Sequence, residues 1–329
     1  MATLRPSPER SLAALNEVRR WVPPTPLTLE NELSHLLGAE VYVKHEYESP
    51  VRSFKIRGAV NLVADLVTDP GIARLYTVST GNHGAAMAYA CRQYGMALTV
   101  VAPVGADESK LALIREFGAD LELLGRDLDE GKELLLERGF EAGHLFIEDG
   151  KSARIVEGTS TIGLELADQQ PGLEAVFVPV GNGALIGGLA SSLKAANPAV
   201  QIIGVQSEEA PCMALSFANG RPTDTATAET FAGGMAVRVA IPEAVELMLE
   251  VVDRMVLVSE IELKRAMLLF QRVTGTLPEG AGAAALAAAL KLRQQSKEDE
   301  PWSLGSVCLI ATGANVDSKL IREVESLLR

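Results

Sequence analysis

The amino-acid sequence predicts an α/β fold with two lobes, each formed by a mainly parallel sheet covered by helices. Short runs rich in β-branched residues alternate with longer runs rich in alanine and leucine, and this alternation is typical of βαβ units. The chain has 329 residues, of which 47% are hydrophobic, so it is long enough to bury more than one core. Three predicted strands also end in glycine and small polar residues, as expected where a strand turns into a helix.

The predicted elements follow one another along the chain. We expect strands at 40–46, 74–80, 97–104, 120–125, 175–181, 200–206 and 306–312. The helices between them are expected near 57–67, from about 83, and near 109–117, 184–195 and 279–292. The last is alanine-rich and is entered by glycines, so it is predicted to be a tightly packed core helix. Residues 219–234 are small and polar with a Gly-Gly end, which predicts a loop that either crosses an active site or connects two elements.

Charge and composition argue against several classes of partner. The chain has 30 Lys and Arg residues against 43 Asp and Glu residues, which disfavours sequence-independent binding to nucleic acid or to an anionic membrane. No apolar run reaches the roughly 18 residues that a membrane span needs, and the first residues lack the apolar stretch of a signal peptide. We therefore expect a cytoplasmic protein that acts on small molecules.

The three cysteines are predicted to be core thiols. Cys91, Cys212 and Cys308 are odd in number, widely spaced and mostly in apolar surroundings. Neither a disulfide framework nor a zinc site is indicated by this pattern.

Glycine-rich turns follow three of the strands, at 78–86, 178–188 and 310–317. The carboxyl ends of parallel strands meet at one edge of a sheet, where loop amides and helix N-termini bind ligands. The turn "GNGALIGG", residues 181–188, could hold a phosphate in this way, although it lacks the lysine of a P-loop. Close packing of strand against helix explains such glycines equally well.

Lys55 is the residue that most suggests chemistry. It stands between Phe54 and Ile56, and an amine that loses hydration is shifted toward its neutral, nucleophilic form. The ordinary alternative is a lysine with a buried stem and a wetted amino group.

Five ordered segments then decide between these explanations: "SFKIRGA", "STGNHGAAMAYA", "PVGNGALIGGLA", "PEGAGAAALAAAL" and "ATGANVD". From about residue 23 to its end the chain resembles the threonine and serine dehydratase group of fold-type II pyridoxal phosphate enzymes, to which serine racemases and threonine synthases are related. The resemblance implies a lyase that removes water and then ammonia from a small β-hydroxy amino acid, such as L-threonine or L-serine, to give a 2-oxo acid. A racemase, a hydroxyaspartate dehydratase or a threonine synthase on the same scaffold, or a binding protein without catalysis, are the alternatives.

The resemblance also implies roles for individual residues. Lys55 would form the Schiff base with pyridoxal 5′-phosphate and, once displaced by the substrate's amine, act as the general base. Asn82 would bond the cofactor's phenolic oxygen, Thr312 its pyridine nitrogen, and Glu279 would lie near the ring. The phosphate would be bound by Gly181, Asn182, Gly183, Ala184 and Leu185, where the family usually has more glycines.

The turn after the strand at 74–80 would bind the substrate. The substrate's carboxylate is expected to contact Ser79, Thr80, Asn82 and His83. His83 would offer its backbone amide rather than act as a base. Thr80 is also a catalytic candidate, because serine racemases carry there the serine that donates a proton on the face opposite the lysine. Threonine keeps the hydroxyl but adds a methyl group, which argues against racemisation.

Several of these residues also have ordinary structural explanations. Asn82 could cap a helix, Thr312 could bond its own backbone, and Glu279 could favour the start of a helix. His83 could be a capping or core histidine.

Three further positions depart from the family pattern. Arg52 stands where a glycine is usual, so a positive charge lies either near the cofactor or in solvent. Gln206 and Cys212 replace the carboxylates of metal-activated relatives, so no metal site is predicted, and Glu208 and Glu209 are interpreted as a solvated pair.

The resemblance finally implies a division of the chain. Residues 1–68 and 150–329 would form a large cofactor-binding domain and residues 69–149 a small domain, with the active site between them. A homodimer is expected, and a regulatory C-terminal domain is not.

Overall fold

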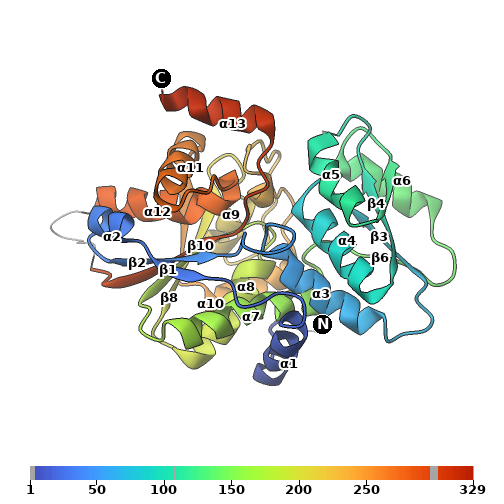
Figure 1. Ribbon diagram of the computed structural model, residues 1–329, viewed down its shortest axis with the longest axis horizontal. Helices are drawn as coiled ribbons and strands as arrows, with labels where there is room; N and C mark the ends of the chain where they lie inside the picture. Colours follow the sequence, from blue (N-terminus) through green and yellow to red (C-terminus); the bar gives the residue numbers. More distant parts are fainter. Residues whose placement is uncertain (1–3, 107, 297–302, 329) are drawn as a thin grey trace.

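The computed structural model describes residues 4–106, 108–296 and 303–328, which form two sheets flanked by helices. The larger sheet has six strands in the order β1-β2-β10-β7-β8-β9, and the smaller has four in the order β5-β4-β3-β6. Figure 1 shows the two sheets in separate parts of the molecule, joined by α3 and α7. Among the described residues, no helix is both long and apolar enough to cross a membrane.

The six-stranded sheet is parallel except at one edge. Its strands are β1 (Leu27–Leu29), β2 (Glu40–His45), β10 (Ser306–Ala311), β7 (Ala175–Pro179), β8 (Gln201–Ser207) and β9 (Arg254–Val258). Only β1 runs antiparallel to its neighbour, whereas β2, β10, β7, β8 and β9 pair in parallel. The central strands β7 and β10 are buried along their whole length, as expected for parallel strands with both faces covered.

Two hydrophobic clusters lie on the two faces of this sheet. Along β7, Val176 and Val178 pack into one cluster, and Ala175 and Phe177 pack into the other, because successive side chains of a strand point to opposite faces. The first cluster includes α7 (Ala153–Gln169), α8 (Ala184–Ala196) and α10 (Pro242–Val251); the second includes α2 (Asn31–Leu37), α11 (Glu260–Thr274) and α12 (Gly280–Gln295). The remaining helices of this part are α1 (Pro8–Val18), α9 (Cys212–Asn219) and α13 (Ser318–Glu325).

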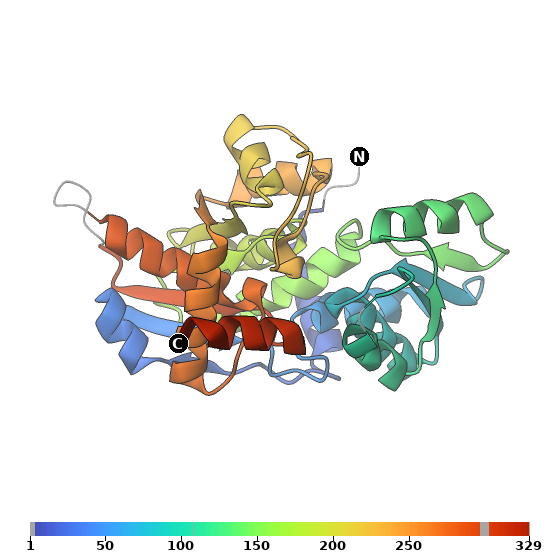
Figure 2. The ribbon, with the colours of Figure 1, turned by 90° about the horizontal axis from the view of Figure 1, so that it is seen from above.

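The four-stranded sheet is parallel throughout. It consists of β3 (Arg74–Val78), β4 (Ala97–Ala102), β5 (Asp120–Leu123) and β6 (His144–Phe146). In Figure 2, α4 (Asn82–Tyr94) and α5 (Glu108–Glu116) lie on one face and α6 (Leu128–Arg138) on the other. The first hydrophobic cluster continues from α7 through α3 (Lys55–Leu66) into this sheet, so α3 carries the predicted lysine between the two sheets.

The predicted α/β class with two mainly parallel sheets is confirmed. The expected elements are present, with small differences at their ends: α3 begins at Lys55 rather than near 57, and α12 begins at Gly280. The three cysteines are buried and free, as predicted. Residues 220–232 form a loop, followed by the short 3-10 helix η1 (Gly233–Met235). The domain boundaries at 68/69 and 149/150 stay a prediction.

Candidate active site

A cavity of about 1130 Å³ lies between the two sheets. Its walls come from the carboxyl end of β3 at Val78, the carboxyl end of β7 at Pro179 and the turn after β10 at Thr312. The loop around η1 forms another wall, so of the two explanations for residues 219–234 the structure supports the crossing of a site. Of the twelve site residues predicted from the sequence, eleven line this cavity; Ala184 does not.

Lys55 is the first residue of α3, and its side chain is only 16% exposed. Its Nζ donates a 2.5 Å hydrogen bond to Oδ2 of Asp149 and lies 5.5 Å from the centre of the Phe54 ring. Burial raises the pKa of Asp149, but the charges of Lys55 and His83 outweigh burial and lower that pKa to about 2. Lys55 is therefore held inside the cavity by a carboxylate rather than extended into water.

The position of Lys55 is fixed by a buried ionic cluster behind it. Arg57, two residues further along α3, is fully buried and bonds both Glu46 and Glu165 at 2.7 to 2.9 Å. Lys44 donates to Glu165 as well, at 2.6 Å. Two cations thus face two carboxylates without net charge, and the cluster ties α3 to β2 and α7.

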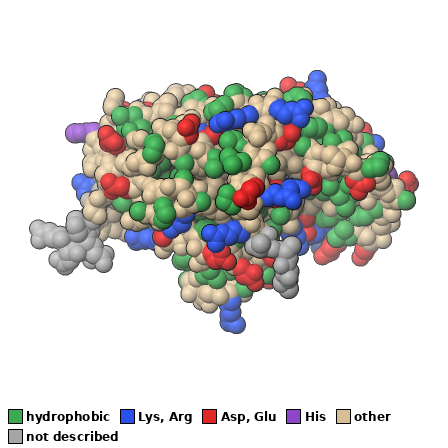
Figure 3. Space-filling view, turned by 90° about the horizontal axis from the view of Figure 1, so that it is seen from below, with side chains coloured by type: hydrophobic (Ala, Val, Ile, Leu, Met, Phe, Trp, Pro, Cys, Tyr) green, Lys and Arg blue, Asp and Glu red, His purple; other side chains and the backbone are tan. Residues whose placement is uncertain are grey.

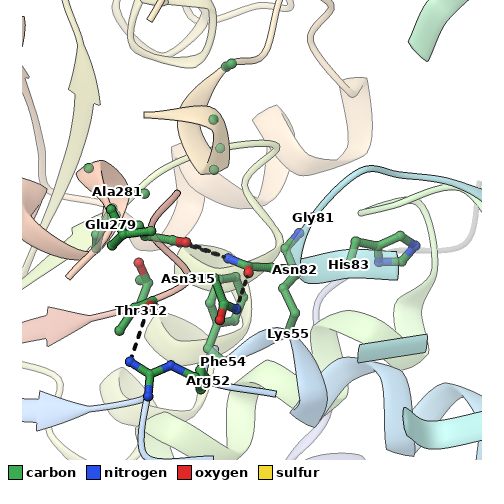
Figure 4. A pocket seen from close by; sticks show the side chains of 18 of the residues that line it. Arg52, Phe54, Lys55, Gly81, Asn82, His83, Glu279, Ala281, Thr312 and Asn315 are labelled. Carbon is green, nitrogen blue, oxygen red and sulfur yellow. Dashed lines mark hydrogen bonds between the residues drawn. The ribbon is translucent and has the colours of Figure 1, made fainter. Parts of the chain in front are cut away.

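Asn82 joins three segments at the centre of the cavity. Its Nδ2 donates to Oε1 and Oε2 of Glu279 at 2.8 and 3.0 Å, and its Oδ1 accepts from Nδ2 of Asn315 at 2.7 Å. Figure 4 shows Asn82 between these two residues. Asn82 opens α4 without capping it through its side chain, so the helix-cap explanation does not account for this residue.

Thr312 follows β10 and is 2% exposed. Within the described part of the chain its Oγ1 is buried and has no hydrogen-bond partner, so it does not bond its own backbone. A buried hydroxyl without a partner costs free energy. This residue therefore fits a ligand atom that accepts a hydrogen bond, such as an unprotonated pyridine nitrogen.

The predicted phosphate loop leads into the N-terminus of α8. Gly183 is the helix's N-cap, with φ 92°, and no side chain caps the helix there, so the first amides of α8 and the positive end of its dipole suit an anion. A Cβ at Gly181 would lie 2.4 Å from the carbonyl oxygen of Gly234, so glycine is required for this close approach. The amide of Ala184 donates to Oδ1 of Asn182 at 3.2 Å, so it is already bonded within the loop. Ala184 also differs from the other four loop residues because it does not line the cavity.

The predicted substrate turn lies on the opposite wall. Ser79 Oγ accepts from the amides of Gly81 and Gly84 at 3.2 and 3.0 Å, so this hydroxyl shapes the turn, and Thr80 lines the cavity beside it. The ring of His83 is buried and points away from the centre of the cavity (Figure 4). It is therefore a core histidine with polar neighbours.

Arg52 adopts a left-handed backbone conformation, with φ 53°, which explains why a glycine is usual in the family at this position. Its side chain lines the cavity and donates to the carbonyl oxygen of Ala314 at 3.2 Å. The sequence left the direction of this side chain open, and the structure directs it to the cavity.

In this chain the residues at the position of the metal site of metal-activated relatives make hydrogen bonds within the protein. Gln206 Oε1 accepts from the amide of Ala214, and Cys212 Sγ lies 3.4 Å from the carbonyl oxygen of Thr223. Among the described residues there is no group of three or more His, Cys, Asp and Glu side chains that could hold a metal ion. Glu208 is not simply solvated, because it accepts a 2.8 Å bond from Lys291.

Sequence reasoning missed Asp149 and Asn315. Asn315 lies in the glycine turn 310–317 and Asp149 follows a short strand, but a carboxylate after a short strand and an asparagine after a glycine turn carry no distinctive local signal. Only the packing of the two sheets shows that they face Lys55 and Asn82.

Comparison with known proteins agrees with this geometry. The family model for "Pyridoxal-phosphate dependent enzyme" matches residues 18–313. The L-threonine ammonia-lyase of Thermotoga maritima is 35% identical over 98% of this chain and 78% of its own length. The catabolic L-threonine dehydratase of Escherichia coli K12 is 32% identical over 91% of this chain and 90% of its own.

Solved structures give the same result. Threonine deaminase isoform 2 of Solanum lycopersicum, in its processed form, superposes with a TM-score of 0.88 at 29% identity, covering 99% of this chain and 95% of that one. Maize serine racemase superposes with a TM-score of 0.89 at 25% identity, covering 98% of each chain. The chain belongs to the pyridoxal-phosphate dependent enzymes of fold type II.

Proposed function

We propose that this protein is an ammonia-lyase that removes water and then ammonia from a small β-hydroxy amino acid of the L-threonine or L-serine type, leaving a 2-oxo acid. The observation that carries the proposal is the position of Lys55, whose side chain lines the same cavity as the substrate turn and the glycine loop. The relatives named as threonine ammonia-lyases and dehydratases support the same reaction. A racemase, a hydroxyaspartate dehydratase and a threonine synthase are less favoured.

The residues present fit pyridoxal 5′-phosphate. Thr312 would meet the pyridine nitrogen with its partnerless hydroxyl, the N-terminus of α8 after Gly181 and Gly183 would hold the phosphate, and Asn82 would turn its amide to the phenolic oxygen. When bound, the cofactor supplies an electron sink for the negative charge that develops at the substrate's Cα.

Side chains of this protein would bind the substrate and move its Cα proton. Lys55 would accept the Cα proton, and the turn of Ser79, Thr80, Asn82 and His83 would hold the substrate carboxylate. Thr312 is an uncharged hydroxyl, so it would leave the ring nitrogen without a proton and keep the sink weak. A weak sink favours prompt loss of the β-hydroxyl over return of the proton, and so elimination over racemisation.

The test is an assay of keto acid and ammonia over a panel of β-hydroxy amino acids in both enantiomers. We expect turnover of L-threonine or L-serine, and we expect Lys55→Ala to abolish both turnover and borohydride-stable attachment of the cofactor. Lys194→Ala is the matched control, because Lys194 pairs with Asp253 far from the cavity lining. Borohydride labelling of a different lysine, or release of the opposite enantiomer without keto acid, would overturn the proposal.

The replaced carboxylates at Gln206 and Cys212 predict independence from divalent ions. Treatment with a chelator followed by gel filtration should leave activity unchanged, and added magnesium or calcium should not raise it. Loss of most activity with chelator and its recovery with either ion would contradict the assignment of this segment.

We also propose the remaining features expected from the sequence. They are a large domain of residues 1–68 and 150–329, a small domain of residues 69–149, a homodimer, a cytoplasmic location and no binding to nucleic acid. Three buried free thiols support a reducing compartment, and on the face shown in Figure 3 basic and acidic side chains are interspersed. Analytical ultracentrifugation, cell fractionation and limited proteolysis near residues 68 and 149 test these points.

A further inference from the structure

Three titratable groups meet around one carboxylate in the wall of the cavity. Asp149, which follows β6, accepts from Lys55 Nζ through Oδ2 at 2.5 Å, and its Oδ1 faces Nδ1 of His83 at 3.5 Å. This Oδ1 is buried and makes no hydrogen bond within the described part of the chain. Lys55 comes from α3 and His83 from α4, so the carboxylate links the two sheets.

The neighbours of His83 determine which ring nitrogen carries its proton. The hydroxyl of Thr77 donates its single hydrogen to the carbonyl oxygen of Ile147 at 2.9 Å. Toward His83 Nε2, at 3.1 Å, the same hydroxyl can only accept. In the neutral ring the proton is therefore on Nε2, and Nδ1 presents a lone pair to Asp149.

The charges around His83 act in opposite directions. Burial lowers its pKa, the carboxylate of Asp149 raises it, and the ammonium group of Lys55 lowers it again, with a net lowering. Neutralising Lys55 removes one lowering effect and leaves the raising effect of Asp149 in place. The pKa of His83 must then rise.

Other charged groups near this carboxylate are already paired. Glu148, next to Asp149, forms ion pairs with Lys132 of α6 and Lys151. On α3, Arg57 is bonded to Glu46 and Glu165. Asn182, from the loop before α8, also bonds Asp149 but is neutral.

We propose that Lys55 and His83 share Asp149 as one counter-ion, so that His83 takes up a proton from water when Lys55 releases its own. One proton leaves Nζ, one proton arrives at Nδ1, and Asp149 stays ionised, so charge and protons balance. Asp149 is about one third exposed, so solvent reaches the carboxylate that lies between the two basic groups. His83 acts through Asp149 and is a positioning residue.

This inference rests on the proposed role of Lys55 as the amine that binds the cofactor. Such an amine has to change between its ammonium and neutral forms during the reaction. Each proton that His83 takes up replaces positive charge that Lys55 has lost beside Asp149. The cost of leaving a partly buried carboxylate without a cation is avoided at each change.

The test is the titration of His83 by ¹H–¹⁵N NMR in the full-length protein. The chain has four histidines, and His83→Gln identifies the signal. We expect an Nε2-protonated neutral ring at pH 7 in the cofactor-free protein. In Lys55→Met we expect the midpoint of the His83 titration to rise by about one pH unit, a tenfold change in proton affinity.

Two variants provide the controls. In Lys151→Met, which removes an exposed cation from the same loop, the His83 midpoint should stay where it is; in Lys55→Met/Asp149→Asn it should fall back to the wild-type value or below. If Lys55→Met does not fold, as judged from the signals of His45 and His144, Lys55→Gln replaces it. An unmoved midpoint, a shift as large in Lys151→Met, or a neutral ring protonated on Nδ1 would each overturn the inference.

These measurements do not depend on the substrate. A failed NMR test leaves the production of keto acid intact, and a failed deamination assay leaves the coupling between Lys55 and His83 intact. The two proposals therefore fail separately.

Discussion

At the scale of single residues, the site combines groups whose surroundings set their chemistry. Thr312 has a buried hydroxyl without a partner, Asp149 keeps its charge beside Lys55, and Arg52 occupies a backbone conformation that favours glycine. The sequence identified Thr312 and Lys55 through the motifs around them. It could not identify Asp149, because its role depends on the approach of two helices distant in the chain.

Thr312 provides a test of the reaction type. In Thr312→Asp, a buried carboxylate should favour a proton on the ring nitrogen and strengthen the electron sink. We expect a larger share of deuterium-exchanged amino acid relative to keto acid when the reaction runs in heavy water. Thr312→Ala should slow elimination and weaken cofactor binding without that change, since a lost hydrogen bond is worth about 0.5 to 1.5 kcal/mol. An unchanged partition in a folded Thr312→Asp protein would place Thr312 away from the ring.

His45 predicts a dependence of stability on pH. Burial, and then the charge of Lys44, lower its pKa to about 4, below the value of about 6.5 in an unfolded chain. Between these values the unfolded state binds more protons, so stability falls as the pH falls from 6.5 to 4, by about 3 kcal/mol at most from this residue. Urea unfolding of wild type and His45→Gln should show a smaller slope in the variant. His35→Gln, at an exposed position, should keep the wild-type slope; if it also flattens the profile, His45 is not the source.

At the scale of secondary-structure elements, α3 and the loop before α8 place the chemistry. The run "SFKIRGA" begins α3 and carries both the reactive lysine and Arg57, which anchors the helix from behind. The hydrophobic pattern predicted the helix, but not its exact start, since the N-cap residue is Phe54 and no capping side chain marks that start in the sequence. The ionic cluster could not be predicted, since Glu46 and Glu165 come from separate elements.

The ionic cluster predicts a strong effect of removing its centre. Arg57→Met leaves Glu46 and Glu165 facing Lys44 alone in a buried site, so we expect a loss of about 3 to 5 kcal/mol in the free energy of unfolding. Urea denaturation measures it. Arg138→Met removes an exposed partner of Glu122 and should cost at most about 1 kcal/mol. Equal effects of the two substitutions would mean that the cluster adds nothing beyond a surface ion pair.

At the scale of the whole molecule, the cavity belongs to both sheets and not to either one. Alternation of strand and helix predicted both sheets, and the glycine turns indicated which ends of their strands would meet. The way the two sheets face each other was not predictable, because it is set by side chains of α3, α4 and α7 that look like ordinary core residues in the sequence.

Because both parts of the molecule line the cavity, cofactor binding should slow hydrogen exchange in both. Hydrogen exchange should slow in residues 79–84 of the smaller sheet's turn and in residues 181–187 and 312–315 of the larger part, since ligand binding suppresses local opening. The exchange of α2, none of whose residues lines the cavity, serves as the internal reference. Protection confined to one of the two parts would show that only one wall contacts the cofactor.

The contacts of Asn82 have a mechanical consequence. Its single side chain joins α4 of the smaller sheet to Glu279 and Asn315 of the larger part. An amide that turns to the cofactor's phenolic oxygen cannot keep both hydrogens on Glu279. Cofactor binding would thus replace part of a direct tie between the two parts by a tie that runs through the ligand.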